Sequence, residues 1–359
     1  MTETPPLVSP LVTADSVTFR LPDRDEPTDE PTLDGARLLP ALSLPDAGLD
    51  FVHDEGEWRL TLPRPPVHRM EYKFRLHRPA GDAEEICDPA NPLRAPGAFG
   101  DKSVVEFPGY AAPAWLTAER VPGEYVDLSI PAPLLEHDVD ARVWTPGDPD
   151  EPLPLLVAHD GPEYDRLADL TGFAAAMIAE ERLPRCRVAL LAPGARDDNY
   201  SANPWYAATL HQRILPALRD AVAVTGPVAG MGASLGGLAM LHAQRALPGL
   251  FGGLFLQSAS FLTIELDPQE SGRFSKFAQV STYVAKVQAE GAPFESVPTV
   301  LTCGLAEENL ANNRQMVLTL VAHGYDARLV EVPDAHNYVG WRDAFDPALA
   351  ELLRELWEV

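Results

Sequence analysis

The chain contains a serine flanked by glycines, between an apolar segment and a run of small residues, and this feature constrains the fold more than any other. Ser234 lies at the centre of the pentapeptide GASLG (residues 232–236), which follows PVAGM and precedes a stretch rich in Ala and Leu. Residues without bulky side chains let a strand and the helix after it approach each other closely at a sharp turn. We therefore predict a buried strand over residues 227–231, a strained turn at Ser234 and a helix over residues 235–246.

A turn of this kind presents a serine hydroxyl at the carboxyl end of a sheet, as the nucleophile turn of α/β-hydrolases does. At average glycine and serine frequencies, the bare G-x-S-x-G pattern arises by chance in roughly one chain in ten of this length. The predicted strand before Ser234 and the predicted helix after it make the pattern more specific. The sequence thus indicates an α/β fold with Ser234 as the candidate nucleophile.

The length of 359 residues exceeds what one ordinary core holds and favours two domains. Up to about residue 110, short segments alternate between apolar and polar residues; they are SVTFRL, EWRLTL, YKFRLHR and SVVEF. This period of two predicts a small all-β sandwich. The acidic, proline-bearing residues 23–34 are expected to form a solvated loop. Prolines over residues 108–123 indicate a linker, and we place the domains at residues 1–115 and 116–359.

From about residue 124, apolar strands alternate with helical stretches, which is typical of a mostly parallel sheet covered by helices on both faces. The eight predicted strands are YVDLSI, ARVWTP, LPLLVAH, CRVALLA, PVAGM, GLFLQS, TVLTCG and ARLVEV. The predicted helices cover residues 171–181, 207–221, 235–246, 309–323 and 343–357. The expected fold class is therefore α/β, with an eight-stranded sheet of the α/β-hydrolase type after the small all-β domain.

The formal net charge of −25 argues against nucleic acid or an anionic membrane as a partner, because both bind basic surfaces. The three cysteines lie far apart, without the spacing of a metal site, and we expect buried free thiols, no metal and no cofactor. The first ten residues lack the basic and apolar regions of a leader, and no apolar run reaches about 18 residues. We therefore expect a cytoplasmic protein.

A serine hydroxyl is a weak nucleophile, so it needs a base, and the base needs an acid that orients it. In α/β-hydrolases the order along the chain is serine, acid, histidine. After Ser234, His242 lies two turns along the predicted helix, and His323 is placed at the end of another helix. His336 instead follows a predicted strand, in the loop PDAHNY. We expect His336 to be the base, because loops at the carboxyl ends of strands form the site in such sheets.

The acid is expected in the loop GLAEEN, which follows the strand before that of the histidine. We select Glu307 as the acid, with Glu308 and Asp334 as alternatives. A structural interpretation is also open, because carboxylates in the first turn of a helix interact favourably with the helix dipole. The sequence therefore leaves the acid as the least constrained member of the three.

The oxyanion hole needs two backbone N–H groups, one from the residue after the nucleophile and one from the loop after the third core strand. The first is Leu235. In the loop after the third core strand Pro162 has no N–H, which leaves Gly161 or Glu163 as the second donor, and we select Gly161.

The loop after CRVALLA interleaves polar and aromatic residues that can orient a ring or a sugar. The expected substrate-binding residues are Arg196, Tyr200 and Asn203 of this loop, together with Trp341, which follows His336. The alternatives are that the loop only caps itself and that Trp341 serves in packing.

Several ordered segments together make the chain resemble the enterochelin esterase and esterase D-like family of α/β-hydrolases over nearly its whole length. They are SVTFRLP, YKFRLHR, DPANP, SVVEFPGY, DGPEY, RDDNYSANPWY, GMGASLGG, CGLAEEN and HNYVGWRDAF. The resemblance implies that the first domain is an early-set immunoglobulin-like domain. It also implies that Ser234 is the nucleophile, His336 the base and Glu307 the acid. Members of this family cleave ester bonds in catecholate siderophores, and relatives hydrolyse feruloyl or acyl esters or transfer acyl groups.

We therefore expect a serine carboxylic ester hydrolase that acts through an acyl-enzyme on a small-molecule ester. The favoured form is an enterochelin esterase-like enzyme for siderophore or related aryl or acyl esters. Two alternatives stay open: an acyltransferase of the esterase D type, and a non-catalytic glycan-binding or scaffold protein. The sequence also leaves open the acyl group, the alcohol and the oligomeric state, including a homodimer.

Overall fold

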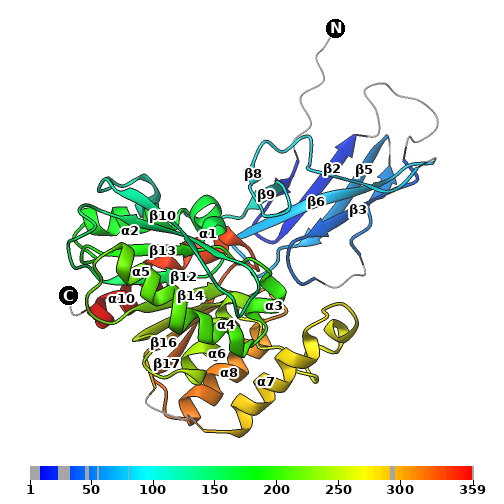
Figure 1. The fold of residues 1–359 in the computed structure, drawn as a ribbon. Coiled ribbons are helices and arrows are strands. Elements are labelled where there is room, and N and C mark those ends of the chain that lie inside the picture. Colours follow the sequence, from blue (N-terminus) through cyan, green and yellow to red (C-terminus); the bar gives the residue numbers. More distant parts are fainter. Residues whose placement is uncertain are drawn as a thin grey trace. The chain divides into compact units, whose positions relative to one another are not determined.

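The computed structural model describes residues 9–22, 33–44, 48–54, 56–79, 81–291 and 296–357 (Figure 1). By their contacts the residues form two units. The first unit holds residues 1–111 together with two short later segments, residues 304–307 and 333–337, and the second unit holds the rest. Most of the predicted acidic loop, residues 23–32, lies outside the described residues.

The predicted linker contains a short helix, η1 (Ala114–Thr117), whose tryptophan is buried. The ring centroid of Trp115 lies 5.4 Å from that of Phe173 and 6.4 Å from that of Phe345. All three residues belong to the second unit. Contacts therefore divide the chain after Ala111, a few residues before the expected boundary, because the bulky Trp115 packs with the second unit.

The first unit contains two antiparallel sheets. One has the order β1 (Leu11–Val12), β2 (Ser16–Pro22), β5 (Glu57–Pro63) and β4 (Val52–Asp54). The other has the order β3 (Gly35–Pro40), β6 (Arg69–His77), β9 (Lys102–Glu106) and β8 (Arg94–Ala95), with β7 (Glu84–Ile86) paired to β6. The four strands predicted from alternation correspond to β2, β5, β6 and β9.

Alternating burial along the strands of the first unit follows the alternation of the sequence. On β2, Val17, Phe19 and Leu21 are buried, while the residues between them are partly exposed. The ring centroid of Phe19 lies 4.8 Å from that of Tyr72, which is on β6 of the other sheet. The two sheets therefore share one apolar core.

The second unit is built on an eight-stranded sheet in the order β10-β11-β13-β12-β14-β15-β16-β17. The strands are β10 (Glu124–Ile130), β11 (Val139–Thr145), β12 (Leu155–Ala158), β13 (Arg187–Leu191), β14 (Ala229–Ala233), β15 (Gly253–Gln257), β16 (Thr299–Gly304) and β17 (Ala327–Val332). β11 pairs antiparallel with β10 and β13, whereas β13, β12, β14, β15 and β16 run parallel. All eight predicted strands are present, and the sheet is mostly parallel as expected.

Helices follow most of the strands. The α-helices are α1 (Gly161–Ala168), α2 (Leu170–Ala179), α3 (Arg196–Tyr200), α4 (Pro204–Thr209), α5 (Leu215–Ala221), α6 (Leu235–Ala246), α7 (Phe277–Ala289), α8 (Leu310–Ala322), α9 (Tyr338–Asp343) and α10 (Ala350–Trp357). The shorter elements are the π-helices η2 (Leu210–Ile214) and η4 (Phe345–Leu349) and the 3-10 helix η3 (Pro268–Gly272).

The predictions of α2, α6 and α8 are confirmed, and α6 has the predicted bounds. The helix predicted over residues 343–357 is interrupted at Asp346, whose backbone is not helical. Asp346 precedes Pro347, and a residue before proline is disfavoured in the helical region. The helix predicted over residues 207–221 is made of α4, η2 and α5, and α1, α3 and α7 have no counterpart among the predicted helices.

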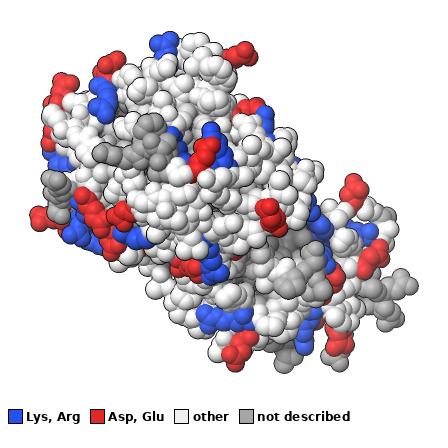
Figure 2. All heavy atoms as spheres, turned by 90° about the horizontal axis from the view of Figure 1, so that it is seen from below, with Lys and Arg blue, Asp and Glu red and all other residues white. Residues whose placement is uncertain are grey.

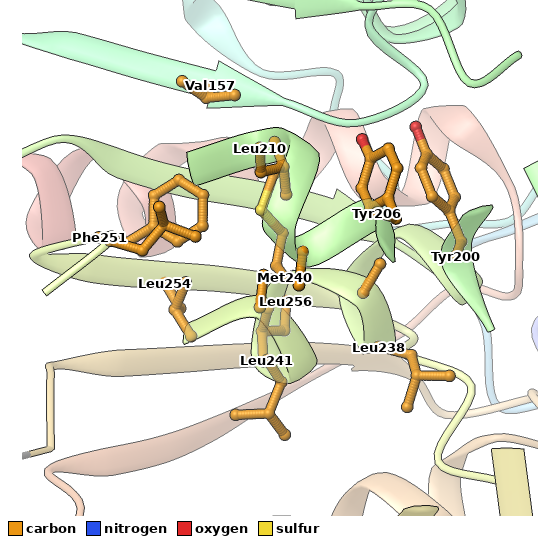
Figure 3. Close-up of a cluster of buried hydrophobic side chains, with 14 of the residues drawn as sticks. Val157, Tyr200, Tyr206, Leu210, Leu238, Met240, Leu241, Phe251, Leu254 and Leu256 are labelled. Atoms are coloured by element: carbon orange, nitrogen blue, oxygen red, sulfur yellow. The ribbon is translucent and has the colours of Figure 1, made fainter. Parts of the chain in front are cut away.

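Helices cover both faces of the large sheet, so each face has its own apolar core. On β15, Leu254 and Leu256 point into one core, while Phe255 between them points into the other. In the first core, Leu238 and Leu241 of α6 lie beside the side chains of β15 (Figure 3). This burial on both faces explains why the central strands, β12 to β16, are buried along their whole length and largely apolar instead of alternating.

Several expectations from composition can be compared with the structure. Cys186 and Cys303 are buried as expected, whereas Cys87 is partly exposed. Within the described ranges, no helix is long and apolar enough to cross a membrane. On the face shown in Figure 2, acidic and basic side chains are interspersed, and the described residues form no extended basic patch there.

Candidate active site

Ser234 lies in a strained turn between β14 and α6, as the sequence predicts. Its backbone has φ 55° and ψ −126°, a combination that residues with a side chain rarely adopt. A Cβ atom on Gly232 would lie 2.5 Å from the carbonyl carbon of Gly236, and one on Gly237 would lie 2.9 Å from Cβ of Ala259. Glycines are therefore required where the strand and the helix approach each other.

The hydroxyl of Ser234 has a second serine beside it. The two oxygens, Oγ of Ser234 and Oγ of Ser260, lie 3.1 Å apart. Ser260 follows β15, is 6% exposed, and donates its backbone N–H to the carbonyl of Ser234 over 3.1 Å. Ser260 is not among the predicted site residues. Its position just after β15, the strand parallel and adjacent to β14, could have indicated that it lies near Ser234.

Gly161 and Leu235, the predicted oxyanion donors, are the first residues of α1 and α6. N–H groups in the first turn of a helix have no intrahelical acceptor, so they remain available to an anion. β12 and β14 are adjacent and parallel, so the turns that follow them lie at the same edge of the sheet. A Cβ atom on Gly161 would lie 2.3 Å from Cα of Leu190, so this position also requires glycine.

Buried polar contacts hold the turn before α1. The carboxylate of Asp160, whose φ is 49°, accepts two hydrogen bonds of 2.8 Å from Arg196. Nδ1 of His159 lies 2.9 Å from the carbonyl oxygen of Gly236, and the His159 ring stacks on that of Tyr200 at 4.5 Å. Burial lowers the pKa of His159 to about 4, so the ring is neutral near pH 7 and its Nδ1–H donates. The turn before α1 is therefore bonded directly to the first turn of α6.

Glu307 and His336 form a hydrogen-bonded pair. Nδ1 of His336 lies 3.0 Å from Oε2 of Glu307. Oε1 of the same carboxylate accepts a 2.8 Å hydrogen bond from the N–H of Gly304, the last residue of β16. The Glu307 side chain is 1% exposed and that of His336 is 38% exposed, so the acid is enclosed while the imidazole reaches solvent. The structure thus brings together the predicted base and the predicted acid.

The alternative acids have other surroundings. Glu308 is exposed. Asp334 is 6% exposed, and its Oδ1 accepts hydrogen bonds from Nδ2 of Asn337 and from the N–H of Ala335. Burial raises the pKa of Asp334 to about 6, against the opposing effect of the Arg69 charge. Asp334 is therefore bonded within its own loop, while Glu307 contacts the imidazole.

The loops that carry Glu307 and His336 belong by their contacts to the first unit, although they follow strands of the large sheet. The N–H of His68 donates to the carbonyl of Pro333 over 2.7 Å. The N–H of Ser43 donates to the carbonyl of Ala306 over 2.9 Å. Residues distant in the sequence therefore fix the backbone beside the acid and the base.

Each predicted substrate-binding residue has a partner within the second unit. Besides the pairing of Arg196 with Asp160, Tyr200 is fully buried under His159. Oδ1 of Asn203 accepts the N–H of Trp205 and caps α4. Nε1 of Trp341 donates to Oγ of Ser258 over 2.9 Å, and Trp341 is 7% exposed. Contact of these four residues with a substrate stays a prediction.

Among the described residues, no group of three or more His, Cys, Asp or Glu side chains is arranged to hold a metal ion. The predicted site residues instead supply a serine hydroxyl, an imidazole bonded to a carboxylate, and backbone N–H groups at two helix starts. These are the kinds of group that acyl transfer through a covalent intermediate uses.

Comparison with known proteins gives one family. Residues 132–352 match the model of the Esterase family, described as "Putative esterase". This range covers more than half of the 359 residues and includes every predicted catalytic residue. No curated protein matches the chain.

Solved structures match at low sequence identity. The enterobactin esterase from Shigella flexneri is 20% identical, with 97% of this chain and 95% of that chain covered and a TM-score of 0.72. The ferric enterobactin esterase from Salmonella typhimurium is 18% identical, with 96% and 95% covered and a TM-score of 0.76. A ferulic acid esterase is 15% identical, with 65% and 98% covered and a TM-score of 0.53. The chain therefore belongs to the Esterase family, and over nearly its whole length it has the fold of enterobactin esterases.

Proposed function

We propose that this protein is a serine carboxylic ester hydrolase that works through an acyl-enzyme, with Ser234 as nucleophile, His336 as general base and Glu307 as acid. The observation that carries the proposal is the 3.0 Å contact between Nδ1 of His336 and Oε2 of Glu307. This pair occurs in loops after β16 and β17, and Ser234 sits in a strained turn after β14 of the same sheet. An imidazole bonded to an enclosed carboxylate has its tautomer fixed, as a general base requires.

The proposed reaction starts with Nδ1–H of His336 donating to Glu307, which leaves a lone pair on Nε2. Nε2 takes the proton of Ser234 as Oγ attacks the ester carbonyl carbon. The protonated imidazole then gives this proton to the departing alcohol, and Ser234 keeps the acyl group. Water, deprotonated by the same Nε2, then attacks the acyl carbon, and the bond to Oγ breaks as the imidazole returns that proton to Oγ, which releases the carboxylic acid and the free serine.

We also propose that the N–H groups of Leu235 and Gly161 stabilise the negative charge on the ester oxygen. Their positions at the starts of α6 and α1 support this role, because those N–H groups need no intrahelical partner. The hydrogen bond between His159 and Gly236 fixes the spacing of the two turns. Donors that are already in place need no reorganisation during the reaction.

For the substrate we propose a siderophore ester of the enterochelin type or a related aryl or acyl ester. Support comes from the shared fold with proteins named enterobactin esterase, ferric enterobactin esterase and ferulic acid esterase. Trp205 at the start of α4 is 59% exposed and available to an aromatic ring. We further propose that the first unit is an early-set immunoglobulin-like domain and that the protein works in the cytoplasm.

The test is intact-mass labelling with a fluorophosphonate, applied to the wild type and to Ser234→Ala. We expect one label per wild-type chain and none on the variant. A panel of aryl, feruloyl and catecholate esters, with and without an added alcohol, then separates hydrolysis from acyl transfer. Diversion of product from free acid to a new ester would indicate a transferase. Absence of labelling in the folded wild type would contradict the proposal and favour a binding protein.

A further inference from the structure

Ser260, in the loop after β15, contacts the candidate nucleophile through both its backbone and its side chain. The N–H of Ser260 donates to the carbonyl of Ser234 over 3.1 Å, and the N–H of Ser234 donates to the carbonyl of Gln257 over 2.9 Å. The two hydroxyl oxygens, Oγ of Ser260 and Oγ of Ser234, lie 3.1 Å apart. The loop therefore holds the backbone of Ser234 on both sides and places a second hydroxyl against the first.

Buried amide side chains hold this loop in place. Nδ2 of Asn309 donates to the carbonyl of Ser258 over 3.0 Å, and Nδ2 of Asn313 donates to that of Ala259 over 2.9 Å. Both asparagines are buried. Ser258 has a φ of 44°, which residues with a side chain adopt at a cost, so the loop keeps a strained conformation that these hydrogen bonds stabilise. The position of Ser260 is thus set by backbone contacts and not by its own hydroxyl.

The contact between the two hydroxyls has an ordinary explanation, because a buried polar group needs a hydrogen-bond partner. Within the described ranges, the structure gives the Ser260 hydroxyl no partner besides Oγ of Ser234. Ser260 is buried, whereas Ser234 is partly exposed and accessible to a substrate. The ordinary explanation leaves open which of the two hydroxyls donates, and the reaction decides this point.

Only one of the two hydroxyls can donate across the 3.1 Å contact at a time. In the proposed hydrolysis the proton of Ser234 passes to Nε2 of His336, so it is not available to Ser260. The direction that is compatible with reaction is therefore donation from Ser260 to a lone pair of Ser234. This direction also leaves the proton of Ser234 free to point toward the base.

We propose that the Ser260 hydroxyl donates a hydrogen bond to Oγ of Ser234 and stabilises the negative charge that this oxygen develops in both steps of the reaction. The inference rests on the proposed function, because it takes Ser234 as the nucleophile. Ser260 keeps its own proton throughout and forms no bond to the acyl group. It thus acts on the nucleophile and not on the substrate.

The hydrogen bond contributes to each step in a definite way. In acylation, one lone pair of Oγ forms the bond to the ester carbon while Ser260 donates to another. In deacylation, the bond between Oγ and the acyl carbon breaks, and Oγ carries negative charge until the imidazole returns its proton. A hydrogen bond to a charged oxygen is stronger than one to a neutral oxygen, so it lowers the barrier of both steps.

The test compares Ser260→Ala with the matched control Ser281→Ala. Ser281 of α7 and Ser260 are both 6% exposed, so each variant loses one buried hydroxyl. Oγ of Ser281 donates to the carbonyl of Ala278, away from the serine turn. The rate constant for fluorophosphonate labelling of Ser234 should fall about 10- to 100-fold in Ser260→Ala, while the final level stays at one label per chain. Ser281→Ala should label at the wild-type rate.

Turnover of an activated aryl ester separates this role from a structural one. In Ser260→Ala, kcat should fall by the same factor with KM unchanged, because both steps slow and no contact with the substrate is lost. The Tm should stay near that of the wild type, since backbone contacts hold the loop. A purely structural hydroxyl would instead lower the Tm and the labelled fraction, and kcat per labelled site would keep its wild-type value. That result would overturn the proposal.

The remaining outcomes distinguish this inference from the proposed function. Wild-type protein that labels at Ser234, with an equal rate in Ser260→Ala, would overturn the inference and leave the proposed function standing. Labelling of Ser234→Ala at Ser260 would show that Ser260 is itself a nucleophile and would overturn its role as a donor. Absence of labelling in the folded wild type would reject the proposed function, and the inference with it.

Discussion

The serine turn and the loops that carry Glu307 and His336 are held in place by different kinds of contact. At the serine turn, Gly232 packs against Gly236, and the residues that fix the backbone lie close together in the sequence. The loops after β16 and β17 instead receive hydrogen bonds from residues of the first unit, such as that from His68 to Pro333. One half of the candidate site is therefore encoded locally, and the other depends on a distant part of the chain.

This difference predicts how the two halves respond to change. A substitution in the serine turn should act through local backbone strain. A substitution in the loops of the acid and the base should act through the orientation and protonation of side chains. Four sets of variants, ordered from the largest expected effect to the smallest, test this contrast.

The largest effect is expected for Ser234→Ala, which removes the proposed nucleophile but adds no bulk. The kcat on an activated aryl ester should fall by a factor on the order of 10⁴ to 10⁶ if the three residues act as a unit. The Tm should stay near that of the wild type, because the side chain is only shortened. A residual rate close to that of the wild type would remove Ser234 from the mechanism.

Glu307→Gln tests the other half. The amide can still accept from Gly304, but it offers an N–H where His336 needs an acceptor, so the wrong tautomer is favoured. We expect kcat to fall by a factor of about 10³ to 10⁴. Glu308→Gln is the matched control and should stay within about threefold of the wild type. The double variant Ser234→Ala/Glu307→Gln should be no slower than Ser234→Ala alone.

A larger loss in Glu308→Gln than in Glu307→Gln would reassign the acid. Additive losses in the double variant would show that the serine and the acid act separately. The first result would contradict the contrast because Glu308, unlike Glu307, groups by its contacts with the second unit. The second would contradict it because the two halves would then not cooperate in one reaction.

Gly232→Ala tests the local encoding of the serine turn. Its Cβ atom would meet backbone atoms of the first turn of α6, starting with the carbonyl carbon of Gly236 at 2.5 Å. Overpacking of this kind costs about 1 to 3 kcal/mol. Gly230→Ala, on the same strand, meets only side-chain atoms of Met240 and Phe251 at 3.1 Å, which can move. Urea unfolding should therefore show a larger loss of stability for Gly232→Ala, and equal losses would contradict local encoding by backbone contact.

The same contrast explains how much the sequence revealed. The eight strands of the large sheet, the bounds of α6 and the place of Ser234 follow from patterns of apolar and small residues along the chain. Period and glycine placement are local properties, so one sequence is enough to detect them. The short, polar α3 lacked such a pattern and was not predicted.

Neighbouring carboxylates illustrate what the sequence leaves undecided. Glu307 and Glu308 are adjacent, and both suit the start of a helix, yet only the tertiary structure directs one toward Gly304 and His336 and leaves the other exposed. The contact between Ser260 and Ser234 and the pairing of Arg196 with Asp160 likewise join separate loops. The pattern of apolar and polar residues along the chain cannot predict such contacts, because each contact depends on which turns meet at one edge of the sheet.

The smallest effect is expected from Asp334→Asn, which tests how the loop of the base is held. In the folded protein burial raises the pKa of Asp334 to about 6, against an ordinary 3.8, so folding favours the protonated form. The contribution of protonated Asp334 to the free energy of unfolding is complete below pH 3.8 and is lost as the pH rises through 6. Between pH 5 and pH 8 the wild type should thus lose about 1.4 kcal/mol that Asp334→Asn does not lose. Asn keeps the Oδ1 acceptor for Asn337 and Ala335, so the variant removes only the charge. The free energy of unfolding in urea, measured for both proteins at both pH values, isolates the effect of that charge. If the two proteins changed in parallel with pH, the carboxyl would not be held in the buried state described here.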